Sequence, residues 1–206
     1  REELHRHQAR GLLEMNTARG FTLLELLTTI AIAAIAMSLA VPSMVDFQRN
    51  ADLTSAANTL TSAINAARGE AMKRNRHAFV KPLGSDWASG YRVFIDLDNN
   101  QTFDDGSDIL VTRQDPAQGA SFSNLEFTGA GTAAGSTPYL RFDGSGYLRD
   151  NASGFATAAI TLKRLDTRGT AKEYERTRTV LIARTGRVRT CKPSGSSDAN
   201  CDPANP

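Results

Sequence analysis

The chain has 206 residues, of which 40% are hydrophobic, 22% charged and 7% aromatic, and its formal net charge is +2. This composition is typical of a globular chain with one sizeable core, and the length is too short for two domains that each have a large core. The histidines are His5, His7 and His77, and there are two cysteines. That stock builds neither a multi-histidine zinc site nor a four-cysteine finger, and no nucleophile motif accompanies His77. We therefore predict no enzyme, no cofactor and no metal.

The first distinctive feature in the chain is an apolar run. Residues 21–41 read FTLLELLTTIAIAAIAMSLAV and contain one charge, Glu25. A helix of this length spans about 30 Å, the thickness of a bilayer core. Arg19 and earlier arginines predict that the N-terminus stays in the cytoplasm. A signal peptide is a poorer explanation, since the run is too long and no A-x-A site follows. We therefore expect a transmembrane helix over residues 21–41.

The start of this run carries a processing motif. Residues 19–27 read RGFTLLELL, a combination that resembles the type IV prepilin motif. The resemblance implies that a prepilin peptidase cuts between Gly20 and Phe21 and methylates the new N-terminus, so that residues 1–20 form a leader. Met15 would start a short leader; residues 1–14 would then lie upstream of translation, or they would belong to a longer leader.

Glu25 needs its own explanation, because a carboxylate in hydrocarbon is costly unless it has a partner. By the same resemblance, Glu25 pairs with the N-terminal amine of a neighbouring subunit and sets the register of assembly. The alternative is an acid that snorkels to the membrane interface.

Residues 42–77 change from apolar all round to amphipathic. Pro42 separates the two halves of the expected helix, and proline bends a helix axis. Beyond it, apolar residues recur at three- and four-residue steps. This alanine-rich stripe predicts that a sheet from the rest of the chain packs closely on it. The stripe comprises Leu53, Ala56, Ala57, Leu60, Ile64, Ala67 and Ala71.

After His77 the sequence favours strands separated by turn-forming clusters of Asp, Asn, Gly and Ser. No second helical pattern follows, so residues 78–190 are expected to form an antiparallel β-rich head. The predicted fold class is α+β and pilin-like, with one long N-terminal helix packed on this head. The expected strands are Ala78–Leu83, Tyr91–Leu97, Ile109–Arg113, Ser121–Phe127, Tyr139–Phe142, Ala159–Leu165, Thr177–Ala183 and Arg187–Thr190.

Two stretches of the head extend the resemblance. Residues 87–96 read WASGYRVFID and residues 178–189 read RTVLIARTGRVR, and both resemble the GspH/FimT family of minor pilins and pseudopilins. This resemblance implies a low-abundance subunit at the tip of a type IV pilus, with other major and minor pilins as partners. It also implies a single pass through the bacterial inner membrane, with the head in the periplasm, before the subunit enters the filament.

Two other functions stay open at this point. One is an H-type minor pseudopilin of a type II secretion system, which shares the fold. The other is a membrane-anchored periplasmic binding module that does not polymerise.

Two further motifs have plain structural explanations. Cys191 and Cys201 have nine residues between them, and an oxidising periplasm favours a disulfide that closes the tail, residues 191–206. Residues 96–104 read DLDNNQTFD and space oxygen ligands like the start of a calcium loop. That loop lacks the glycine of the sharp turn, and Ser107 replaces the closing glutamate. A solvated hairpin turn is therefore favoured.

Charge is distributed unevenly along the head. Residues 80–160 contain five basic and ten acidic residues, a net of −5, whereas residues 161–192 contain ten basic and three acidic residues, a net of +7. A basic segment beside an acidic body is a candidate anion-binding surface. The alternative is that the arginines pair with acids and solvate edge strands.

The basic segment ends in residues 186–189, GRVR, which resemble the GRxR motif of FimT-like minor pilins associated with DNA uptake. Alternate strand residues project from one face about 7 Å apart, and each guanidinium can bind a phosphate with paired donors. The predicted partner is therefore double-stranded DNA, bound without sequence readout for uptake in natural transformation. The expected DNA-binding residues are Arg184, Gly186, Arg187, Arg189 and Lys192.

Overall fold

The computed structural model describes residues 20–116, 125–165 and 172–206. It divides into two compact units, Arg1–Ser43 and Met44–Pro206, and the helix α1 (Leu23–Arg74) contributes to both. In the first unit α1 begins after Thr22, whose Oγ1 accepts a hydrogen bond from the backbone N–H of Glu25 at 3.1 Å. Thr22 therefore caps the helix N-terminus.

The expectation of a transmembrane helix over residues 21–41 concerns this first unit. Among the described residues, no helix is long and apolar enough to cross a membrane.

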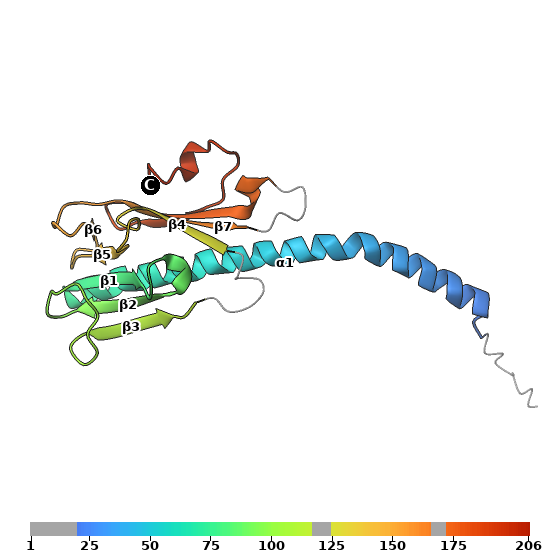
Figure 1. Cartoon of the computed structure of the whole chain (residues 1–206), viewed down its shortest axis with the longest axis horizontal. Helices are drawn as coiled ribbons and strands as arrows, with labels where there is room; N and C mark the ends of the chain where they lie inside the picture. The colour runs from blue at the N-terminus through green and yellow to red at the C-terminus, as the bar shows by residue number, and fades with distance from the viewer. Residues whose placement is uncertain (1–19, 117–124, 166–171) are drawn as a thin grey trace, which may run out of the picture. The chain divides into compact units, whose positions relative to one another are not determined.

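The second unit contains two antiparallel sheets beside the C-terminal half of α1 (Figure 1). The first sheet has the strand order β3-β2-β1-β5-β6 and the second has the order β4-β7-β8-β9, so β9 is an edge strand. The strands are β1 (His77–Pro82), β2 (Tyr91–Asp96), β3 (Ile109–Gln114), β4 (Leu125–Gly131), β5 (Leu140–Phe142), β6 (Leu148–Arg149), β7 (Ala158–Arg164), β8 (Thr177–Ile182) and β9 (Val188–Cys191), and the 3₁₀ helices are η1 (Trp87–Ser89), η2 (Glu173–Arg176) and η3 (Ala199–Cys201).

One hydrophobic core joins α1 to the inner faces of both sheets. The predicted stripe on α1 forms its centre, since all of its members are buried except Ala56, which is partly buried and packs on the same core. Small alanine side chains let the backbones of two sheets approach one helix closely. The expected α+β class, with an antiparallel head on one long helix, is confirmed.

Most strand ends lie within one residue of those expected, and three differences are larger. The helix ends at Arg74 because Asn75 adopts φ +50, and the N–H of Arg76 donates to the Ala71 carbonyl, which closes the last turn and lets His77 begin β1. The strand expected over Ser121–Phe127 is β4, which extends to Gly131; residues 121–124 lie outside the described residues. The two-residue strand β6 was not predicted.

Candidate nucleic-acid interface

A tight turn between β8 and β9 carries the GRxR motif. The N–H of Gly186 donates to the carbonyl of Ala183 at 2.8 Å, and the N–H of Ala183 donates to the carbonyl of Arg187 at 3.0 Å. Gly186 has φ +73, a left-handed conformation that glycine adopts without steric cost. The turn therefore delivers Arg187 directly to the start of β9.

Arg68 on α1 holds this turn by hydrogen bonds from its guanidinium group. Its Nε donates to the Gly146 carbonyl at 3.0 Å, and its Nη2 donates to the Thr185 carbonyl at 3.2 Å. Sequence reasoning missed this role, because Arg68 lies more than a hundred residues before the turn and resembles any solvated helix arginine. The hairpin is thus tied to the helix through the Thr185 carbonyl, and the same arginine holds the turn between β5 and β6 at Gly146.

One face of β9 contacts the core and α1. Val188 packs on the core, and the Thr190 Oγ1 lies 2.9 Å from the Thr61 Oγ1 on α1. Because side chains alternate along a strand, Arg189 projects from the face opposite Val188 and Thr190. The strand was expected to start at Arg187, but β9 starts at Val188, so Arg187 lies at the turn immediately before it.

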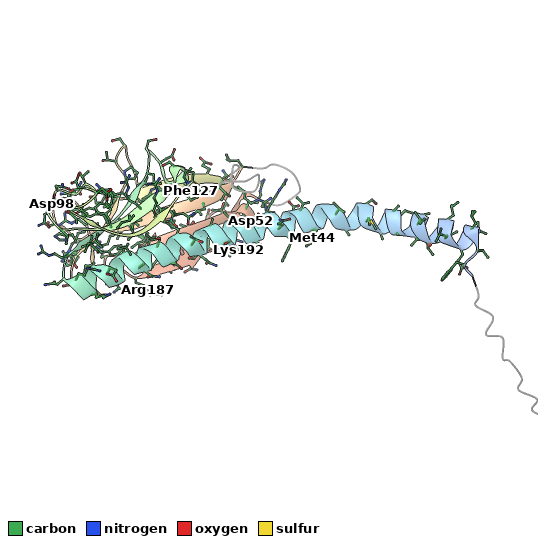
Figure 2. All side chains as sticks on the ribbon, turned by 90° about the horizontal axis from the view of Figure 1, so that it is seen from below. Met44, Asp52, Asp98, Phe127, Arg187 and Lys192 are labelled. Carbon is green, nitrogen blue, oxygen red and sulfur yellow. A yellow bond between two sulfur atoms is a disulfide. The ribbon has the colours of Figure 1, made fainter. Side chains whose placement is uncertain are left out.

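The predicted basic residues are available to a ligand. Arg184, Arg187 and Lys192 are exposed and Arg189 is half-buried. Within the described ranges, none of these four side chains has an ion pair or a hydrogen bond. Figure 2 labels Arg187 and Lys192, which flank β9 in the sequence. Arg184, Arg187 and Arg189 thus lie on one hairpin without an ion pair in the described structure, and Lys192 follows its second strand.

Several other described cations of the basic segment have partners within the fold. Arg164 is only 4% exposed, and its Nη1 donates to the Asn50 Oδ1 on α1 at 3.0 Å. Arg178 is buried and donates to the backbone carbonyls of Thr177 and Glu175, and burial lowers its pKa. Lys163 pairs with Glu173, Arg176 also has a partner, and Arg168 lies outside the described residues. The net charge of this segment therefore overstates the cationic surface.

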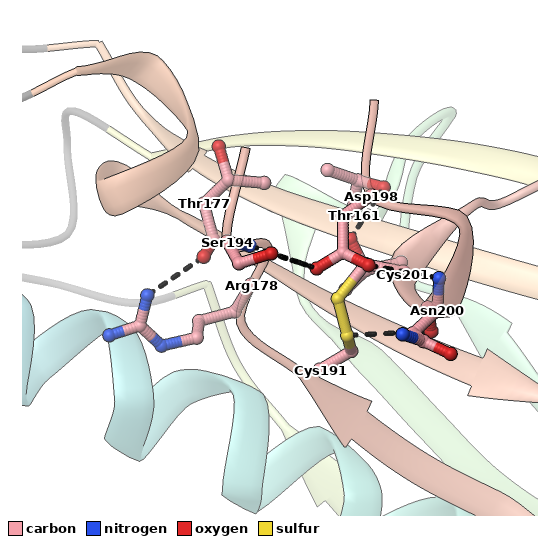
Figure 3. The surroundings of a disulfide bond; sticks show 9 residues. Thr161, Thr177, Arg178, Cys191, Ser194, Asp198, Asn200 and Cys201 are labelled. Atoms are coloured by element: carbon pink, nitrogen blue, oxygen red, sulfur yellow. Dashed lines mark hydrogen bonds between the residues drawn. A yellow bond between two sulfur atoms is a disulfide. The ribbon is translucent and has the colours of Figure 1, made fainter. Parts of the chain in front are cut away.

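The C-terminal tail is held by the expected disulfide, which is confirmed (Figure 3). Cys191 and Cys201 are bonded, with their Cα atoms 5.6 Å apart. The Asp198 carboxylate accepts the backbone N–H groups of Ser194 at 2.9 Å and Asn200 at 3.0 Å, which lowers the pKa of Asp198. The bridge and this carboxylate order a segment with few apolar residues.

The tail also limits the basic surface. A hollow beside β8 is lined by Thr179 and by tail residues that include Asp198 and Asp202. Thr179 pairs with Cys191 in the sheet, whereas Arg189 pairs with Leu181 nearer the turn. Acidic groups therefore gather at the Cys191 end of β9, and the arginine pair lies toward the turn end. Lys192 lies beyond the strand, at the acidic end.

Removing the bridge should loosen the tail and leave the core intact. A ten-residue closure stabilises its loop by about 2–3 kcal/mol on a chain-entropy basis, and the tail contributes little to the core. We expect Cys191→Ser to make residues 192–206 sensitive to protease and Cys201 open to alkylation, while the main thermal transition shifts only slightly. Limited proteolysis and thiol labelling of both forms measure this. Free labelling of both thiols in the wild-type protein would contradict the bridge.

The comparisons with known proteins agree with this architecture. Residues 56–186 match the family described as type II transport protein GspH, and residues 15–41 match the prokaryotic N-terminal methylation motif. The pilin-like protein PilA1 of Thermus thermophilus is 33% identical over 174 residues, which cover 84% of this chain and 98% of that protein. The crystal structure of the type IV minor pilin FimU of Pseudomonas aeruginosa superposes with a TM-score of 0.51 at 19% identity, covering 73% of this chain and 99% of FimU. That structural likeness shows the pilin fold.

Proposed function

Because the chain belongs to the GspH family of minor pilins and pseudopilins, we propose that it is a type IV pilus subunit that binds double-stranded DNA through the β8–β9 hairpin. Family membership makes it a structural protein that associates with other pilins, not an enzyme. The observation that carries the DNA proposal is the set of basic side chains without described partners: three arginines on that hairpin and Lys192 directly after it.

The chemistry of the hairpin suits a phosphate backbone. Arg189 lies on β9 and Arg187 immediately precedes that strand. Where the backbone is extended, side chains two residues apart start about 7 Å apart, and each guanidinium offers paired donors to one phosphate. Arg184 and Lys192 add two more charges. About four phosphate contacts give a logarithmic salt slope near −3.6 for duplex DNA, with no dependence on base sequence.

A second function is favoured by the description of the matching family itself, a type II transport protein. In that case the chain would be an H-type minor pseudopilin, and the arginines would only keep the edge strand β9 from pairing with another sheet. DNA binding distinguishes the pilus subunit from the pseudopilin. Protecting the edge of a sheet requires only positive charge, whereas binding DNA requires two arginines spaced to reach successive phosphates.

The test is a titration of the full-length protein, in mild detergent, with duplex DNA at two salt concentrations. The double variant Arg187→Gln, Arg189→Gln should reduce the salt slope from near −3.6 to about −1.8, since two of four contacts are lost. A matched control, Lys73→Gln with Arg113→Gln, removes the same charge from exposed positions on α1 and β3. Equal losses in both double variants, or unchanged binding in the first, would show that the hairpin is not the site.

The N-terminal motif is the basis of the assembly part of the proposal. A prepilin peptidase would cut after Gly20, and Glu25 would pair with the new amine of a neighbouring subunit. The residence of the chain in the inner membrane, with its head in the periplasm, stays a prediction. Glu25 is exposed and lies in the first turn of α1, where an acid also interacts favourably with the helix dipole.

Glu25→Ala should be cleaved normally and enter filaments several-fold less well than the wild type. Glu25→Gln is the informative partner variant, because it keeps the size and helix propensity of glutamate and removes only the charge. We expect both variants to fail alike if pairing with an amine drives incorporation. The measurement is the ratio of this subunit to major pilin in sheared filaments. Normal incorporation of Glu25→Gln would show that the charge has no part in assembly.

A further inference from the structure

The loop between β2 and β3 gathers three carboxylates at one end of the head. Oxygen atoms of Asp96, Asp98 and Asp108 all lie within 4.8 Å of one another, and Figure 2 labels Asp98 at that end. Two opposed Ca²⁺–oxygen bonds of about 2.4 Å span about 4.8 Å. The three oxygens are therefore spaced like ligands of one cation, yet like charges this close repel one another.

The carboxylate of Asp96 is buried, and one of its oxygens has no hydrogen-bond partner in the described structure. The residue is 1% exposed, and its Oδ2 accepts the N–H of Gln101 at 2.9 Å, but its Oδ1 is buried with no hydrogen-bond partner in the described structure. Burial, with the neighbouring Asp98 and Asp108, raises the pKa of Asp96. A buried carboxylate oxygen without a partner is costly, so the site is incomplete as the chain alone builds it.

Neighbouring cationic side chains are committed elsewhere. His77 pairs with Asp96 across the sheet, but burial and the charge of Arg141 lower the pKa of His77, which disfavours its cationic form. Arg141 donates to the Asp150 carbonyl and the Ser153 hydroxyl. The Lys81 Nζ donates to the Gln101 carbonyl and attracts Asp96 without bonding to it.

The loop is also held in place without a cation. The Phe103 ring packs edge-on against Phe94 with centroids 5.5 Å apart, which ties the loop to the sheet. The Asp108 carboxylate accepts the N–H groups of Leu97 at 2.9 Å and Asp104 at 3.0 Å. Each of those oxygens retains a second lone pair, and the exposed Asp98 leaves the group open to solvent. Such a preorganised, open set of hard oxygens is suited to a divalent cation.

We propose that the β2–β3 loop binds one Ca²⁺ ion through Asp96, Asp98 and Asp108. Three carboxylates supply part of the 6–8 oxygens that Ca²⁺ takes, and water completes the shell through the open side. Mg²⁺ demands bonds of about 2.0–2.1 Å in a near-ideal octahedron, whereas Ca²⁺ accepts longer bonds in a flexible geometry, so Ca²⁺ is the better match for this group. The position of Asp108 explains why the sequence favoured a plain turn. A calcium loop that started at Asp96 would have its closing glutamate at position 107, where Ser107 stands, and the acid Asp108 follows one position later.

The experiment uses the full-length protein after removal of cations by a chelator, titrated with CaCl₂ by calorimetry. We expect one saturable site with a Kd of about 10⁻⁴–10⁻³ M, the range of extracellular modules. Asp98→Asn should weaken binding at least about tenfold, because it removes a ligand charge from an exposed position. The matched control Asp105→Asn removes the same charge from the same loop, outside the group of three, and should leave the affinity within about twofold.

Asp96→Asn gives a second, independent readout. Since the Oδ1 of Asp96 is buried without a hydrogen-bond partner in the described structure, loss of its charge should not lower the melting temperature measured without cation. CaCl₂ should then raise the melting temperature of the wild type but not of Asp96→Asn. Absence of saturable binding at about 10 mM Ca²⁺, an equal response to MgCl₂, or equal weakening by Asp105→Asn would overturn the proposal.

Discussion

Replacing Gly186 with valine should destabilise the head by about 3–4 kcal/mol, among the largest losses that a single side chain causes. A Cβ at this position would lie 2.0 Å from the Gly146 carbonyl oxygen and 2.7 Å from the Arg68 Nε. The first of these atoms belongs to the backbone and cannot move aside alone. The φ of +73 adds strain for any β-branched residue.

Urea unfolding of the full-length protein measures this loss. Gly195→Val is the matched control, because a Cβ there would meet nothing within 4 Å, and we expect a change within about 0.5 kcal/mol. Equal midpoints for the two variants would contradict the close packing of Gly186 on Gly146. The glycine of the GRxR motif therefore has a sufficient explanation in folding and needs no contact with DNA.

Gly20→Val should abolish processing while leaving the fold unchanged. Gly20 is exposed, and a Cβ at this position would meet nothing within 4 Å. Any effect must therefore come from the enzyme that reads the junction. A glycine lets the two backbones approach closely, which a β-branched side chain prevents.

The readout is the mass of the chain recovered from cells that express a prepilin peptidase. Wild-type protein should begin at Phe21, and Gly20→Val should retain every residue before it. Gly195→Val serves again as the control and should be processed like the wild type. A wild-type N-terminus at any residue other than Phe21 would refute the assignment of the junction.

The helical spacing of apolar residues made the buried half of α1 predictable. The end of α1 and the strand β6 were missed because no such spacing marks them. The stripe from Leu53 to Ala71 repeats at helical steps, so its burial could be inferred without a structure. The end of the helix could not be inferred from the sequence, because Asn75 adopts the left-handed conformation that a glycine usually signals. Two residues, Leu148 and Arg149, are too few to show the alternation that identifies a strand.

Tertiary pairing explains the displaced strand β4. Gly129 and Gly131 have poor strand propensity, yet they pair with Ile160 and Ala158 of β7. A Cβ at Gly129 would lie 1.8 Å from the carbonyl oxygen of Ala133. The close approach of the chain to itself requires glycine there, and no local pattern reveals that requirement.

The same limit applies to the candidate DNA-binding site. The alternation of Arg187 and Arg189 is local and could be inferred from their spacing. The burial of Arg164 is not local, because its partner Asn50 lies 114 positions earlier in the chain. Counting charges along the sequence therefore located the basic hairpin but could not separate its free cations from the structural ones.

The capping contact of Thr22 makes the first turn of α1 independent of what precedes it. Donor and acceptor both lie within residues 22–25, so a cut before Phe21 would remove no bond from the helix. The cut would instead create an ammonium group at the positive end of the helix dipole, an unfavourable position for a cation. Glu25 is the acid in that first turn. Its carboxylate would thus offset, within one subunit, an electrostatic cost that arises only when the leader leaves.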